Sequence, residues 1–214
     1  MKVALRGFAA AVALSVVASV SAAEAATLSF KLTDTQGSAS SDTDVVLEDV
    51  AGGVKFTYTV NDPANTADLA SVFFNVSGVT PALSLANIAN DAGAVTGVFL
   101  NTNGTGPNGL GGNIGQTFDI AIKIGELGSG GDFFSSFVFT ILASGLDVSD
   151  FLGQTFAVRG QTVRPPNSTG GGSSSKEFGV APGTPDNVVP LPAAAWFLLT
   201  GLGGLMAAGR RSAV

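Results

Sequence analysis

The most informative feature of this 214-residue chain is the chemistry that it lacks. It contains no cysteine and no histidine, and only one tryptophan and one tyrosine. The missing residue types exclude disulfides, thiol nucleophiles, a Ser-His-Asp triad and zinc sites with histidine or cysteine ligands. Charged residues make up only 12% of the chain. Carboxylate pairs for glycoside hydrolysis remain possible, and without disulfides the stability of the fold must come from packing alone.

The carboxylates show no pattern of a shared active site, because Asp and Glu are scattered through polar segments. The densest group could supply the oxygen ligands that calcium prefers, and it consists of Asp34, Asp42, Asp44, Glu48 and Asp49. Its spacing lacks the central glycine and the closing glutamate of an EF-hand loop. We therefore predict no catalytic residues and no cofactor, with calcium at this group as the one alternative.

The N-terminus has the layout of a secretory signal peptide. Lys2 and Arg6 precede an uncharged apolar run over residues 7–20, and Ala23 and Ala25 follow at the spacing of a cleavage site. We predict cleavage after Ala25, with Ala23 as the second choice. The alternative is an uncleaved anchor, but the apolar run is short for a full membrane span.

The C-terminus predicts a membrane-spanning helix. Residues 188–209 include no charged residue, and Arg210 and Arg211 follow directly. Such a stretch of 22 residues reaches across a hydrocarbon core of about 30 Å at a rise of about 1.5 Å per residue. The two arginines are expected to stay on the cytoplasmic side. The alternative is a buried hydrophobic helix of a soluble domain.

The part between these two ends is distinctly acidic. Residues 26–187 contain six Lys or Arg and fifteen Asp or Glu, which gives a net charge of −9. Binding to nucleic acid or to anionic lipid requires basic patches. The charge balance therefore argues against both partners.

The same part reads as all-β. Residues 54–60 and 117–124 alternate apolar and polar side chains, as half-buried strands do. Clusters of Gly, Asn, Asp and Pro separate the further candidate strands, which are residues 27–32, 45–50, 71–76, 96–100, 133–142 and 155–163.

This pattern predicts one exported domain over residues 26–164, folded as a single antiparallel β-sandwich of the jelly-roll type. Residues 165–187 are rich in Pro, Gly and Ser, and we predict that they form a flexible linker. Residues 188–211 then form the membrane segment, after the signal peptide of residues 1–25.

A short proline motif stands at the head of the membrane segment: Val189-Pro190-Leu191-Pro192-Ala193. The two prolines lack amide donors and favour an extended backbone, which a protease can bind more readily than a helix. The alternative is that the prolines simply begin the transmembrane helix.

The motif, the apolar span and the basic end resemble, in this order, the PEP-CTERM class of bacterial sorting signals, in its VPLPA-CTERM variant. The resemblance covers about the last 25 residues, and residues 73–78 and 153–159 also look like central domains of this class. It implies that an exosortase processes the chain near residues 189–193. It also implies export, surface attachment and association with exopolysaccharide or a biofilm matrix.

We therefore expect a non-enzymatic surface or matrix protein. Signal peptidase and an exosortase are its expected partners, along with exopolysaccharide, and nucleic acid is not. The domain would be periplasmic in a single-pass inner-membrane intermediate and later reach the cell surface or the exterior. The alternative is a secreted carbohydrate-binding module, for which Phe73, Phe74, Phe133 and Phe134 could stack on sugars, although phenylalanine is more often a core residue.

Overall fold

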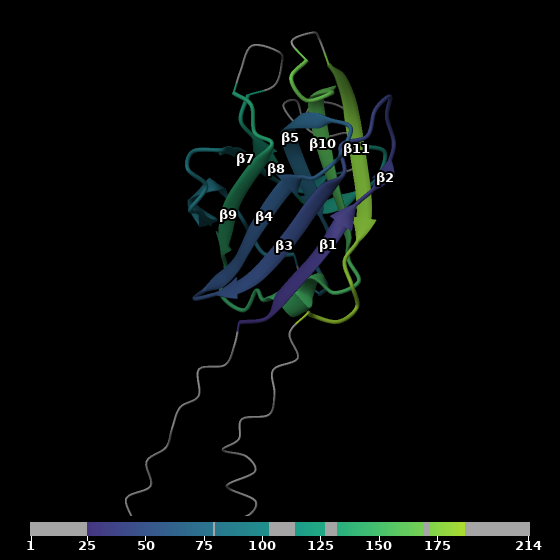
Figure 1. The fold of residues 1–214 in the computed structure, drawn as a ribbon. Helices are drawn as coiled ribbons and strands as arrows, with labels where there is room; N and C mark the ends of the chain where they lie inside the picture. The colour runs from purple at the N-terminus through teal and green to yellow at the C-terminus, as the bar shows by residue number, and fades with distance from the viewer. Residues whose placement is uncertain (1–24, 79, 103–113, 127–131, 169–171, 187–214) are drawn as a thin grey trace, which may run out of the picture. The chain divides into compact units, whose positions relative to one another are not determined.

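The computed structural model describes residues 25–78, 80–102, 114–126, 132–168 and 172–186. These residues form two antiparallel sheets (Figure 1). The first sheet has the strand order β1 (Thr27–Leu32), β3 (Thr43–Val50), β4 (Gly53–Val60), β9 (Ser136–Leu142) and β6 (Ile88–Ala89). The second has the order β2 (Asp34–Thr35), β11 (Ser173–Val180), β10 (Thr155–Arg164), β5 (Thr66–Phe74), β8 (Phe118–Ile124) and β7 (Val95–Thr102).

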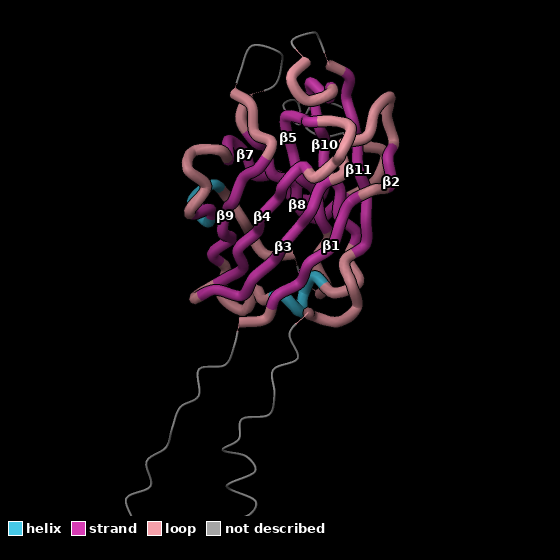
Figure 2. The backbone as a smooth tube through the Cα atoms, in the orientation of Figure 1, coloured by secondary structure: helices cyan, strands magenta, loops and turns pink. Residues whose placement is uncertain are grey.

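The prediction of an all-β sandwich is confirmed, because one apolar core lies between the two sheets. In β8 the side chains of Ile120, Ile122 and Ile124 point into this core, as their alternation indicates. Only two short 3₁₀ helices occur in the described residues, η1 (Leu85–Asn87) and η2 (Val148–Phe151), shown in cyan in Figure 2.

Aromatic side chains from both sheets hold the centre of the core together. The ring of Phe56 on β4 lies 5.1 Å from the ring of Phe74 on β5 and 5.0 Å from that of Phe139 on β9. The Phe151 ring of η2 meets it edge-on at 5.3 Å. These rings are fully buried, so their contacts join the two sheets through the hydrophobic effect and through aromatic geometry.

The predicted linker over residues 165–187 is wrong over residues 173–180. Residues 173–180 form β11, which pairs with β10 on one side and with β2 on the other. The error has a physical cause: the inward positions of β11 hold Ser175 and Glu177, so the strand shows no apolar alternation. Composition therefore predicted a linker at residues that form a strand of the second sheet.

The two ends of the described domain lie together. The amide of Asp186 donates a hydrogen bond of 2.8 Å to the carbonyl oxygen of Thr27. Figure 1 shows the purple start of β1 and the chain that follows β11 at the same end of the sandwich. We call this end the terminal pole, and the opposite end, where residues 61–65 join β4 to β5, the distal pole.

Candidate functional site

The residues of the predicted sorting signal lie outside the described residues: Val189, Pro190, Leu191, Pro192, Ala193, Arg210 and Arg211, together with Ala23. Ala25 is the first described residue and is exposed. Within the described ranges, no helix has the length and apolar character needed to cross a membrane. The predicted anchor over residues 188–211 falls outside those ranges.

The acidic residues named as possible calcium ligands do not meet at one place. Lys31 Nζ lies 3.9 Å from Asp42 Oδ2 and 3.8 Å from Asp44 Oδ1, near the distal pole. Asp49 stands at the other end of β3, where its Oδ1 accepts a 2.8 Å hydrogen bond from the amide of Val148. In the part of the chain that the structure describes, no group of three or more acidic residues could hold a metal ion.

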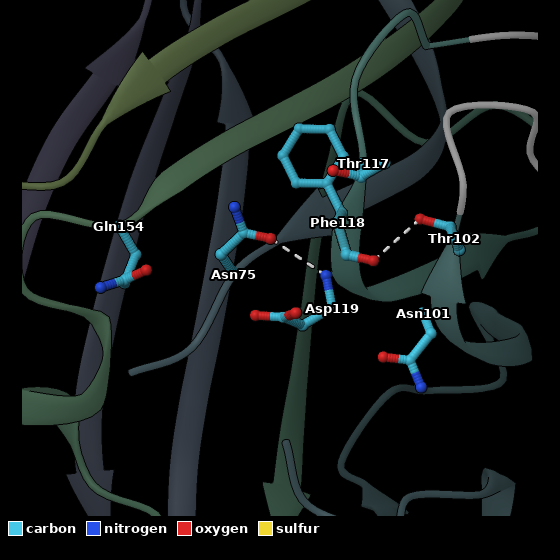
Figure 3. A pocket seen from close by; sticks show the side chains of 7 residues that line it. All are labelled: Asn75, Asn101, Thr102, Thr117, Phe118, Asp119 and Gln154. Carbon is cyan, nitrogen blue, oxygen red and sulfur yellow. Dashed lines mark hydrogen bonds between the residues drawn. The ribbon is translucent and has the colours of Figure 1, made fainter. Parts of the chain in front are cut away.

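A polar pocket of about 430 Å³ opens at the terminal pole. Four neighbouring strands of the second sheet begin or end there, namely β10, β5, β8 and β7. The lining residues are Asn75, Asn101, Thr102, Thr117, Phe118, Asp119 and Gln154, which Figure 3 shows as sticks. The pocket is thus a product of strand order, because its residues come from four separate parts of the sequence.

The best-anchored side chains of the pocket are Asn75 and Asp119. Asn75 Oδ1 accepts a hydrogen bond of 3.0 Å from the amide of Asp119 (Figure 3). In return, Asp119 Oδ2 accepts a hydrogen bond of 3.0 Å from the amide of Val76. This exchange continues the pairing of β5 and β8 beyond the last pair of the ladder, Phe74 and Ile120. Both side chains therefore help to hold the end of the sheet.

The remaining chemistry of the pocket suits a neutral polar ligand. Asn101 and Gln154 offer amide groups, which both donate and accept hydrogen bonds. The Phe118 side chain is only 2% exposed, so its ring offers no stacking platform. Asp119 is the one carboxylate among the described lining residues, whereas glycoside hydrolysis uses two.

The two phenylalanine pairs that could stack on sugars, Phe73-Phe74 and Phe133-Phe134, lie in different environments. Phe73 and Phe74 are fully buried, which makes them core residues. Phe133 is 44% exposed near the distal pole, and the guanidinium carbon of Arg164 lies 5.8 Å from the centre of its ring. Only one of these four aromatic side chains is therefore strongly exposed.

A buried carboxylate lies near the distal pole. Glu177 is fully buried, and its two oxygens accept hydrogen bonds of 2.6 Å from Thr35 Oγ1 and 2.7 Å from the amide of Ser41. Burial is the main reason why the pKa of Glu177 is raised. The nearby carboxylates of Asp42 and Asp62 raise this pKa further, against the opposing effect of the two hydrogen bonds.

The raised pKa of Glu177 predicts that this side chain contributes more stability on mild acidification. The folded pKa of Glu177 lies above the ordinary value of 4.5, so the folded state binds its proton more tightly than the unfolded chain. The stabilising contribution is complete below pH 4.5 and is lost as the pH rises through the folded pKa.

Urea unfolding at pH values on both sides of this range, for the wild type and Glu177→Gln, measures the effect. We expect a clearly smaller gain in unfolding free energy on acidification in the variant. Glu48→Gln is the control, because it removes one surface charge that pairs with Lys55. An unchanged pH dependence in Glu177→Gln would contradict the prediction.

Comparison with known proteins finds no matching family model, no matching curated protein and no matching solved structure. The pocket itself was not predicted from the sequence. Two stretches singled out by the resemblance, residues 73–78 and 153–159, contribute Asn75 and Gln154 to it. No sequence signal joined these stretches, because their proximity depends on the pairing of β5 with β10.

Proposed function

We propose that the chain is a non-enzymatic exported protein of the cell surface or extracellular matrix. In this proposal a C-terminal helix holds it briefly at the inner membrane, and an exosortase then processes it near residues 189–193. The observation that carries the proposal is the order of proline motif, uncharged span and paired arginines at residues 188–211.

The position of the domain ends supports this role. Because the amide of Asp186 is bonded to the Thr27 carbonyl, the signal peptide and the anchor would be joined to the same pole. The domain can then complete its fold on the periplasmic side while either segment is still in the membrane. Signal peptidase would cut next to β1, which begins two residues after Ala25.

The character of the domain also agrees with life outside the cytoplasm. It has no cysteine to oxidise, and its net charge of −9 over residues 26–187 favours a solvated protein over one that binds nucleic acid. The chain passes repeatedly between the two sheets, for example from β4 to β5 and from β8 to β9. We infer a winding of the jelly-roll type from these crossings.

The intact mass of the protein recovered from the cell surface tests the proposal. We expect the wild type to lack residues 1–25 and the residues beyond the motif. Replacement of both Pro190 and Pro192 by Ala should leave the C-terminal segment attached, because the extended backbone around Leu191 is lost. A wild-type mass that still includes Arg210 and Arg211 would show that the helix is a permanent anchor.

A second candidate function is carbohydrate binding, and the polar pocket at the terminal pole favours it. Amide groups such as those of Asn101 and Gln154 are suited to the hydroxyl groups of a neutral sugar. Binding of a neutral glucan, measured in the experiment described below, decides between this candidate and a purely structural role for the pocket.

A further inference from the structure

Three cationic side chains form a row across the outer face of the second sheet. Arg159 on β10 is paired in register with Lys176 on β11 and with Ser71 on β5, and Ser71 is paired in turn with Lys123 on β8. The neighbours of these residues along each strand point into the protein, as the burial of Glu177, Val158, Val72 and Ile122 shows. We call Lys176, Arg159 and Lys123 the cationic row.

The cationic row concentrates positive charge on a domain that has little of it. It holds three of the six Lys and Arg residues between positions 26 and 187. Among the described residues, the salt bridges involve only Lys31 and Lys55, which lie on the other sheet. The cationic row thus has no ion-pair partner in the described part of the protein.

Arg159 is partly buried, so the lack of an ion-pair partner for its charge costs free energy. Burial lowers the pKa of its guanidinium, yet arginine stays charged at any physiological pH. A partly buried charge is stable only when something compensates for the water that it has lost. An anion bound from outside would supply that compensation.

No described carboxylate forms an ion pair with the cationic row. Asp68 lies further along β5, where its oxygens accept hydrogen bonds from the amide of Phe134 at 2.9 Å and from Gln161 Nε2 at 2.7 Å. On the same outer face, two residues further along the strands, lies an apolar cluster that includes Phe73, Ala121, Ala157 and Phe178.

We propose that the cationic row binds an acidic polysaccharide, a chain with carboxylates at regular intervals. Neighbouring strands lie about 4.8 Å apart, so an extended chain lying across the strands meets the three cations one after another. The planar guanidinium of Arg159 can hold a carboxylate with two parallel hydrogen bonds. The inference rests on the proposed matrix role and names the kind of ligand that the domain would hold there.

A duplex nucleic acid is a poorer fit to the same surface. Binding to DNA draws its affinity from many phosphate contacts, and three cations on a domain with a net charge of −9 offer few. A polysaccharide with spaced carboxylates needs fewer contacts and presents less repulsion to the rest of the acidic surface.

The experiment measures binding of the full chain, solubilised in a non-ionic detergent, to sodium polygalacturonate by isothermal titration calorimetry. We expect saturable binding that weakens with added salt. Joint replacement of Lys123 and Lys176 by Gln should weaken it by about tenfold or more, because two charge-assisted contacts are lost. The affinities of the two single-lysine variants should lie between those of the wild type and the double variant. These single variants replace the double variant in the test if it folds poorly.

Lys55→Gln is the matched control, because it removes the same charge from the outer side of the first sheet, where Lys55 pairs with Glu48. Its affinity should equal that of the wild type. The proposal is overturned if the wild type does not bind polygalacturonate, if the Lys123 and Lys176 variants bind it as tightly as Lys55→Gln does, or if these variants weaken the binding of dextran by the same factor. Tighter binding of duplex DNA would overturn it too. None of these results affects the mass measurement, so the processing proposal stands or falls separately.

Discussion

Replacement of Phe56 by Ala is expected to lower the free energy of unfolding by about 3–5 kcal/mol, the usual cost of removing a buried aromatic ring. Phe56 is fully buried and touches the rings of Phe74, Phe139 and Phe151, so the cavity left behind cannot collapse onto a flexible surface. Domains of this kind are stable by about 5–15 kcal/mol in total. The variant should therefore populate the unfolded state measurably under mild conditions.

Urea unfolding followed by far-ultraviolet circular dichroism measures this loss. Phe133→Ala is the matched control, since Phe133 is 44% exposed and its removal leaves no closed cavity. We expect the control to lose less than about 1 kcal/mol, including its contact with Arg164. Equal losses in the two variants would mean that the aromatic rings around Phe56 do not form the centre of the core.

Removal of β11 is expected to abolish cooperative folding. A chain that ends after Gly172 loses Ser173–Val180, and with it the ladder to β10, the ladder to β2 and the buried side chain of Phe178. The edge of β10 would then be open over its length, with unpaired backbone groups and exposed apolar surface. We expect no cooperative urea transition and a tendency to aggregate.

The comparison for this truncation is a chain that ends after Asp186. It keeps β11 and the hydrogen bond from the Asp186 amide to the Thr27 carbonyl, so its transition should match that of the longer protein. If residues 165–187 formed a linker, both truncated chains would fold equally well. The experiment therefore separates the strand from the linker directly.

Alternation along the sequence predicted the strands whose inward positions are apolar. β1 has the boundaries that the pattern indicated, and β8 begins one residue later than the pattern and places Ile120, Ile122 and Ile124 in the core. β5 starts at Thr66, five residues before its predicted start at position 71, because Asp68 stands within it. A buried aspartate bonded to Gln161 and Phe134 interrupts the pattern without interrupting the strand.

The polar pocket and the cationic row had no sequence signal of their own. Asn75 and Asp119 are polar residues within candidate strands, and Gln154 directly precedes another candidate strand. Lys123, Arg159 and Lys176 are single charges at scattered positions. These three cations come together only because of the order and the register of β8, β5, β10 and β11.

Residue types and their alternation were enough to predict the all-β class and most strands, and they excluded histidine and cysteine chemistry. These properties follow from residue types and from a period of two, which are local and need no knowledge of distant contacts. The tertiary structure alone decided that residues 173–180 are a strand and that Glu177 is buried. It also decided that three cations lie side by side on an acidic domain. Each of these depends on strand order and register, which are set by the joint packing of two sheets around one core.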